Sequence, residues 1–252
     1  MENKKQIIYG IGRAVLRDFT DKTKIIDYTD LQDASFESSY SKEDITGGNK
    51  LFPIASFKKD TAVKVSATNA TFHPEMIAYM DGATTTVGAA QMMDIKEVLI
   101  PANGVITLDY KPVDGTVLIK GFESTKTTPP VAGKFVVDST SKTVTFATTD
   151  AGKSIVILYE YMGSTSTTNY SITQASMSKP FEFDYLFDIY DDNSQITHKG
   201  LIKVYKMQTT SGFSIDPKHQ SAVAPKFEAE AKDPLRADGH LWDFFIDGVA
   251  VA

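Results

Sequence analysis

Short apolar runs, separated by Gly, Asp, Asn and Pro, recur along the chain and are rich in Val, Ile, Tyr, Phe and Thr. These residue types suit the pleated, half-buried surface of a strand. Residues 181–189 alternate almost strictly: the odd positions are aromatic or apolar, and Glu182, Asp184 and Asp188 share the other face. Residues 201–207 and 226–231 alternate in the same way, and we expect 201–207 to pair with 181–189. The pattern predicts an all-β fold whose antiparallel strands have an apolar face and an acidic, solvated face.

One segment, residues 74–80, favours a helix instead. Pro74 fits a first helical turn, where the missing N–H has no partner, and Glu75 suits the positive end of the helix. Gly82 can adopt the left-handed conformation that ends a helix. Because about two turns would not hold alone in water, we expect this helix to pack on a sheet.

The spacing of the apolar runs changes in the middle of the chain. Residues 98–162 contain six short apolar runs at intervals of 8–12 residues, with turn signals between them, which is typical of a small β-sandwich of the immunoglobulin-like kind. We therefore expect an inserted module over 98–162, between a first domain part at 1–97 and a second part at 163–252. Residues 163–168, rich in Gly, Ser and Thr, are expected to form a flexible exit linker.

A long polar stretch, residues 37–49, lies within the first part. It includes Ser41, Lys42, Glu43, Asp44, Ile45 and Thr46, and it ends in Gly47-Gly48-Asn49. A polar loop of this length is uncommon in a compact domain unless it is functional or becomes ordered on a partner. The sequence therefore predicts a contact loop here.

Composition narrows the class of protein. The 252 residues include 26 Lys and Arg against 32 Asp and Glu, for a net charge of −6, and no Cys. The absence of Cys excludes disulfide scaffolds, iron–sulfur sites and thiol nucleophiles. The acidic balance argues against a protein that binds nucleic acid by neutralising phosphates. No apolar run reaches the roughly 18–20 residues of a membrane span, and no signal-peptide core follows the first residues, so we expect a soluble protein that contacts no membrane.

Candidate chemistry is sparse. The four histidines, at 73, 198, 219 and 240, are scattered, and Gly10-Ile11-Gly12 lacks the third glycine of a nucleotide-binding loop. Residues 188–193 are acidic but lack the spacing of a calcium loop, so a polar hairpin turn is the favoured interpretation. We expect no catalytic residues, no metal and no cofactor, and hence no enzyme.

The order of these segments resembles a known family. A polar loop at 38–48 is followed by a strand at 63–66 that leads into 71–75, and the late alternating strands end with Pro225-Lys226-Phe227-Glu228-Ala229-Glu230-Ala231. This arrangement is similar to the major tail tube protein of tailed bacteriophages and phage-tail-like particles. The resemblance covers about residues 1–97 and 170–252 and leaves the insert outside.

The resemblance implies a β-sandwich with one flanking helix, in subunits that form hexameric rings with a continuous inner β-barrel. The rings stack into a tube whose acidic lumen carries the genome outward. It further implies a virion protein made in the host cytoplasm, with tape-measure, terminator and baseplate or tip proteins as partners. On this basis we expect Glu182, Asp184 and Asp188 to line the lumen, residues 41–46 to lie between rings, and the insert to lie on the outer wall.

Other interpretations remain open. The acidic strand face could be an ordinary solvent-exposed face, since charge alternation produces one in many monomers. A capsid or baseplate decoration protein would share this composition. The Thr-rich insert would also suit a cell-surface carbohydrate-binding module, although such modules usually present exposed aromatic platforms and this chain has a single Trp.

Overall fold

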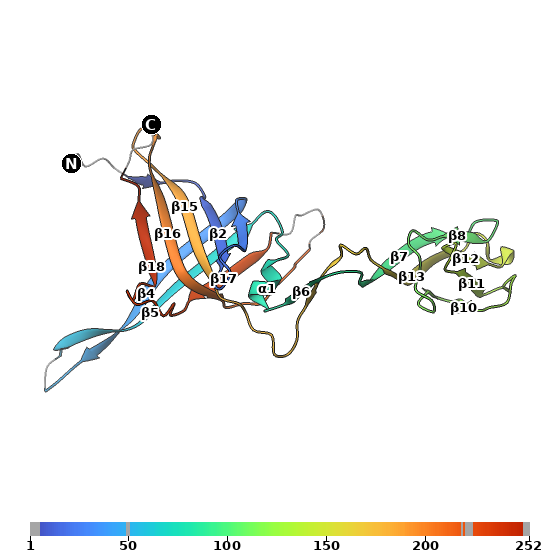
Figure 1. Ribbon diagram of the computed structural model, residues 1–252, viewed down its shortest axis with the longest axis horizontal. Coiled ribbons are helices and arrows are strands. Elements are labelled where there is room, and N and C mark those ends of the chain that lie inside the picture. The colour runs from blue at the N-terminus through green and yellow to red at the C-terminus, as the bar shows by residue number, and fades with distance from the viewer. Residues whose placement is uncertain (1–5, 49–50, 218, 220–223, 249–252) are drawn as a thin grey trace. The chain divides into compact units, whose positions relative to one another are not determined.

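A computed structural model describes residues 6–48, 51–217, 219 and 224–248 (Figure 1). Contacts between residues divide the chain into two compact units, one of Met1–Thr84 with Tyr170–Ala252 and one of Thr85–Asn169. In the part of the chain that the structure describes, the helical elements are α1 (Met76–Met80) and the 3-10 turn η1 (Thr148–Asp150). The prediction of an all-β fold is confirmed.

The first unit contains a nine-stranded sheet in the order β3-β2-β15-β16-β17-β5-β4, with β1 against β15 and β18 against β16. The strands are β1 (Ile7–Ile8), β2 (Arg13–Asp18), β3 (Ile25–Tyr28), β4 (Leu31–Ile45), β5 (Ala55–Asn69), β15 (Phe181–Tyr190), β16 (Ile196–Thr209), β17 (Lys226–Ala231) and β18 (Trp242–Ile246). β15 and β16 pair antiparallel, with Phe183 opposite Val204, which confirms the predicted pairing. Asp191 Oδ1 accepts hydrogen bonds from the backbone N–H groups of Asn193 and Gln195, so the acidic stretch after β15 is the expected polar turn.

The sheet curls around one apolar core. Phe227 of β17 contacts Tyr28 of β3 at 5.5 Å between ring centroids, although three strands separate β3 from β17 in the sheet order. Phe227 also lies 6.2 Å from the rings of both Phe181 and Phe183 on β15. Parts of the sheet that are distant in strand order therefore pack face to face, as the two layers of a sandwich do. The core side chains of β15 are odd-numbered, as the alternation predicts.

The predicted helix is present as α1, which buries Met76, Tyr79 and Met80. It packs into the core of the first unit, in keeping with the expectation that so short a helix needs a sheet beneath it. Gly82 follows it with φ +67°. A Cβ at Gly82 would lie 2.0 Å from the backbone oxygen of Met177, so both the conformation and the available space require glycine there.

The second unit consists of two small sheets around a core of its own. One sheet has the order β10-β11-β12-β8 and the other β7-β13-β9. The strands are β7 (Gln91–Leu99), β8 (Val105–Thr107), β9 (Leu118–Ile119), β10 (Glu123–Ser124), β11 (Lys134–Asp138), β12 (Thr143–Phe146) and β13 (Ser154–Met162). Phe135, Phe146, Ile157 and Tyr159 are among the buried residues that join the two sheets. Each of the six predicted runs overlaps a strand.

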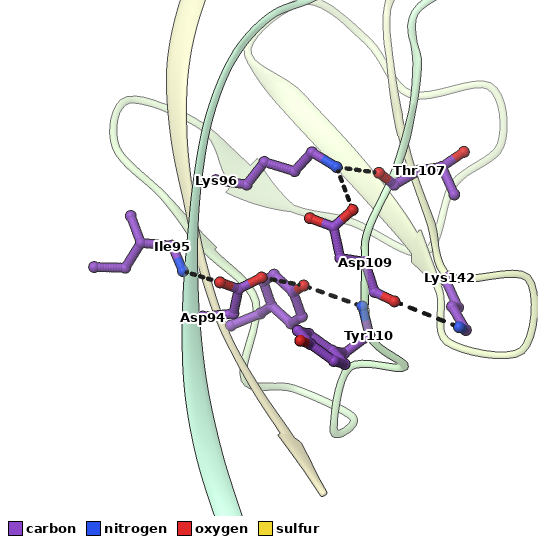
Figure 2. A network of polar contacts seen from close by, with 8 residues as sticks. Asp94, Ile95, Lys96, Thr107, Asp109, Tyr110 and Lys142 are labelled. Carbon is purple, nitrogen blue, oxygen red and sulfur yellow. Dashed lines mark hydrogen bonds and ion pairs between the residues drawn. The ribbon is translucent and has the colours of Figure 1, made fainter. Parts of the chain in front are cut away.

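A polar network fixes the segment after β8 against β7 and β13 (Figure 2). Lys96 Nζ lies 3.0 Å from Asp109 Oδ1 and donates to the backbone oxygen of Thr107 at 2.9 Å. The buried Tyr159 hydroxyl donates to Asp94 Oδ2 at 2.6 Å and accepts from the N–H of Tyr110 at 3.3 Å. Burial, together with the bond to Asp94, raises the pKa of Tyr159 to about 12. The protonated hydroxyl of Tyr159 thus joins β7 to the segment after β8.

The second unit begins and ends differently from the expected insert. β7 starts at Gln91 because it pairs along its whole length with β13, from Met162 opposite Gln91 to Ser154 opposite Leu99. The expected exit linker also forms hydrogen bonds: Gly163 N–H donates to Ala90 O at 2.8 Å, and Gly88 N–H donates to Thr167 O at 2.9 Å. Next to these bonds, β6 (Thr84–Val87) pairs with β14 (Thr168–Ser171). Residues 163–168 are thus one side of a paired ribbon and not a free linker.

Candidate assembly surfaces

The polar stretch predicted as a loop is one arm of a long β-hairpin. β4 and β5, each 15 residues, pair antiparallel from Leu31 opposite Asn69 to Ile45 opposite Ala55, with register shifts after Leu31 and Tyr40. Residues 41–45 lie in β4 and Thr46 follows it, whereas Asn49 lies outside the described residues. The loop interpretation was wrong because this segment buries neither face within the subunit, so its alternation carried no apolar signal.

The outer half of this hairpin, residues 37–61, packs against nothing in its own subunit. Every described residue there is exposed except Gly47 and Ala55, which are half-buried. Figure 1 shows β4 and β5 continuing beyond the rest of the sheet at the lower left. An isolated two-stranded hairpin is at best marginally stable in water. A partner that covers the hairpin would supply the missing packing.

Apolar side chains gather at the end of the hairpin. Leu51 and Phe52 are 95% and 78% exposed, and Ile54 and Ile45 are also exposed. Ile54 N–H donates to Ile45 O at 2.7 Å, which closes the end of the strand pair. We call Leu51, Phe52 and Ile54 the hairpin tip. A contiguous group of exposed apolar side chains is typical of a protein contact.

Charged and aromatic side chains follow the tip along the hairpin. Lys42 and Lys58 lie opposite each other, and both ammonium groups lie over the exposed ring of Tyr40, at 5.7 and 5.3 Å from its centroid. Ser41 Oγ donates to Asp60 Oδ2 at 3.0 Å, and Ser56 donates to Asp44. These cross-strand contacts keep the two arms in register without a hydrophobic core.

The sheet of the first unit ends in β3 on one side and β4 on the other. β3 has four residues and β4 has fifteen. An end strand presents backbone N–H and C=O groups that can pair with another chain. The long β4 is therefore the larger surface available for strand pairing between subunits.

The three acids predicted for the lumen fall into two groups. Glu182 and Asp184 are 13% exposed, and both contact Arg17 of β2, which is ion-paired with Asp184 and lies 3.8 Å from Glu182. Lys22 Nζ lies 2.7 Å from Glu182. Asp188 lies farther along β15, opposite Lys199. The acids share a face by strand parity, as expected, but Asp188 is separate from the other two.

The face that carries these acids also carries bases from the neighbouring strands, and whether it lines a lumen stays a prediction. Across the neighbouring strands, Asp27, Val15, Asp184, Lys203 and Asp243 form one row. This face carries both bases and acids. The bases are Arg13, Arg17, Lys199 and Lys203, and the acids are Asp27, Glu182, Asp184, Asp188 and Asp243. Strand parity finds the acids of one strand, but it does not show which bases the adjacent strands place beside them.

Asp188 lines a groove at the end of β15. The groove has a volume of about 540 Å³, and its lining residues are Tyr9, Gly10, Ile11, Gly12, Arg13, Leu186, Phe187, Asp188, Tyr190 and Lys199. A Cβ on Gly12 would lie 1.9 Å from the backbone oxygen of Leu186, so only glycine lets residues 9–13 lie this close to β15. Gly12 N–H also donates to the hydroxyl of Tyr185 at 3.1 Å. We call this feature the β15 groove.

The second unit has an exposed apolar face of its own on the β7-β13-β9 sheet. Ile95 and Leu118 both lie beside Leu158 of the central strand, and both are exposed. Met93, Leu99 and Val156 are also exposed. This sheet face is a further candidate for protein contact.

Several residues of these surfaces are not among those predicted from the sequence. The hairpin tip was not identified, although Leu51, Phe52 and Ile54 form an apolar cluster that only two residues separate from Gly47-Gly48. Arg17 and Lys22 were missed because nothing in the sequence relates them to β15. Asp191, near the groove, was recognised only as part of a polar turn. The signal that could have identified the tip was its apolarity within a polar stretch.

Comparison with known proteins identifies the family to which this chain belongs. No curated protein matches the chain. Among the described residues, the α-helix α1 has only 5 residues, far short of the roughly 20 apolar residues that a membrane-spanning helix requires. The model of the YomU/Tube protein family matches residues 6–240, which includes the hairpin, the β15 groove and the second unit. This match covers most of the chain, and the protein therefore belongs to the YomU/Tube family, a family of phage tail tube proteins.

Proposed function

We propose that this tail tube protein assembles as hexameric rings, that the rings stack into a hollow tube, and that the tube conducts the phage genome into the host cell. Its family is a structural one of the virion tail and not an enzyme family. The rings, the stacking and the conduit are the proposal. Tape-measure, terminator and baseplate or tip proteins are the proposed partners at the tube's interior and ends.

The β4–β5 hairpin is the observation that carries this proposal. Its outer half is exposed on both faces, and it ends in the apolar hairpin tip. Ordering a residue costs about 1–2 kcal/mol of conformational entropy. In a monomer, no burial of apolar surface offsets this cost for the described residues in the outer half of the hairpin. In a stack of rings the hairpin would pack on the next ring, and burial there would stabilise it.

Truncation of the hairpin tests this role. Residues 41–60 are replaced by Asn-Gly, which joins Tyr40 to Thr61, residues that already lie opposite each other, by a turn suited to a two-residue hairpin loop. We expect a folded subunit that forms no elongated tubes by electron microscopy. As a matched control, Lys59→Ser changes an exposed hairpin residue and should leave elongation intact. Tubes of normal length from the truncated protein would contradict the role.

For the bore, we propose the sheet face that carries Glu182 and Asp184. Outside the β15 groove the acids of this face outnumber its bases, so within a Debye length of about 8 Å the face would bind DNA phosphates only weakly. Asp188 lies in the β15 groove, so we assign it to the rim and not to the bore. The second unit is proposed to lie on the outer wall.

Labelling tests the bore. Asp184 is a poor position for a cysteine because it is ion-paired and mostly buried, whereas Asp27 lies in the same cross-strand row and is exposed. Asp27→Cys gives the chain a single thiol. In assembled tubes we expect labelling by a small maleimide and not by one too bulky to enter the bore. Lys111→Cys, an exposed position in the second unit, should react with both reagents. Labelling of residue 27 by the bulky reagent would contradict the bore assignment.

A further inference from the structure

We propose that the hairpin tip of one copy docks into the β15 groove of a copy in the adjacent ring. This inference rests on the proposed function and names the receptor for the hairpin. The tip consists of Leu51, Phe52 and Ile54, and the receptor lies between residues 9–13 and the end of β15. The occupant of the groove is thus a second copy of this chain.

Both surfaces present apolar side chains that are exposed among the described residues of a single subunit. In the groove, Tyr9 is 77% exposed, and Ile11 and Leu186 are also exposed. The ring of Tyr9 packs edge-on against Tyr190 at 6.2 Å, which gives the groove an aromatic wall. Burial of the tip against these side chains would remove apolar area of both copies from water, which is the main driving force of stable association.

Among the described charged residues of the hairpin, the two acids nearest its end complement the bases of the groove, whereas Lys42 and Lys58 pair one position farther from the tip and lie over Tyr40. Glu43 and Asp44 lie on the exposed arm of the hairpin just before the tip. Arg13 and Lys199 line the groove, are exposed, and form no ion pair with another described residue. The third charged residue of the groove, Asp188, lies opposite Lys199. Two bases against one acid in the groove favour a partner that brings acidic residues.

The tip and the groove of one subunit do not meet. Figure 1 shows the hairpin leaving the sheet at the lower left, away from the upper end of the first unit where β15 and β16 join. The tip is exposed and the groove is open in the same subunit. A subunit with a projecting tip at one place and a receptor at another makes a head-to-tail contact. Such heterologous contacts build open, repeating assemblies, as a stack of rings requires.

Site-directed cross-linking tests the docking. Phe52→Cys and Leu186→Cys are combined in one chain, which has no other thiol, and assembled tubes are treated with a short bismaleimide. We expect a ladder of covalent multimers, because each subunit would be joined to one copy above and one below. The matched control pairs Phe52→Cys with Leu118→Cys, a leucine of the second unit that is more exposed than Leu186, and should give no ladder.

A charge exchange provides an independent test that does not depend on the tip. The pair Glu43→Lys with Asp44→Lys should reduce the length of tubes at least severalfold at low salt, and so should the pair Arg13→Glu with Lys199→Glu. All four changes in one chain should restore tube length, because the attraction between copies is re-formed with reversed signs. Rescue of this kind would not follow from damage to the fold.

The outcomes separate the two proposals. Tubes that form normally but yield no more Phe52–Leu186 cross-link than the control would overturn the docking and leave the tube function standing. A fourfold charge variant that remains as short as each pair would also overturn it. Failure of the unaltered protein to form rings or tubes would overturn the proposed function, and the docking with it.

Discussion

Asp150 of the second unit is an ionised side chain that is almost fully buried. It is 1% exposed, accepts a hydrogen bond from Gly133 N–H at 2.9 Å, and accepts another from Lys153 Nζ at 2.6 Å. The bond from Lys153, and then the one from Gly133, lower the pKa of Asp150 in spite of burial. A lowered pKa in the folded state means that the ionised carboxylate stabilises the fold above the unfolded pKa. This stability is lost as the pH falls through the folded pKa.

Asp150→Asn should therefore destabilise the second unit at pH 7 by about 1–3 kcal/mol, the usual range for the loss of a buried, charge-assisted bond. The difference from the unaltered protein should shrink as the pH falls below the ordinary pKa of an Asp, about 3.9, and should vanish only below the lowered pKa of the folded state, where the native carboxyl is also neutral. Hydrogen exchange of the β11 and β12 amides would measure this difference in the stability of the second unit. Asp114→Asn, at an exposed position, serves as the control. Equal exchange rates for both variants at pH 7 would show that Asp150 does not stabilise the unit.

At the scale of residues, the sequence indicated which side chains share a face but not what lies beside them. The odd positions of 181–189 line the core, as alternation predicted. The paired state of Glu182 and Asp184 was not predictable, because Arg17 is more than 160 residues away in the chain and is brought to β15 only by the pairing of β2. Such long-range neighbours are set by topology, which the alternation of a single strand does not contain.

Among the elements, buried strands were predictable and exposed strands were not. Residues 63–69 alternate between core and surface, whereas the outer half of the same β5 strand has no buried side. The strand at Trp242–Ile246 was missed, and it is also largely exposed. Hydrophobic alternation detects a strand only where one face meets a core. Strands whose two faces are both exposed in the single subunit give no such signal.

The second unit can be tested as a removable element. Replacing residues 89–166 with Asn-Gly joins Gly88 to Thr167, which are already hydrogen-bonded, whereas a cut at 98 would leave 91–97 without their partner strand β13. Because the removed unit has its own core, we expect the first unit to fold and to form tubes. Circular dichroism would show whether the shortened protein folds, and electron microscopy would show whether it forms tubes. An unfolded product would mean that the two units are not independent in folding.

At the scale of the whole molecule, the sequence predicted the all-β class, a helix near residues 74–80 and a second group of short strands. It did not predict that the first unit forms one curled sheet, nor where that sheet ends. The end strands β3 and β4 and the outer hairpin are the features that an assembly would use. These features have faces that no core of the subunit buries, so the hydrophobic pattern of the sequence describes them least well.

The central claim is that this protein forms a tube from stacked rings, and electron microscopy of the purified full-length protein tests it most directly. We predict closed rings with sixfold symmetry at low concentration and hollow tubes with a regular axial repeat at high concentration. Light scattering on the same samples should show the mass rising with concentration. A 27.7 kDa monomer at every protein and salt concentration, with neither rings nor tubes in the images, would contradict the account.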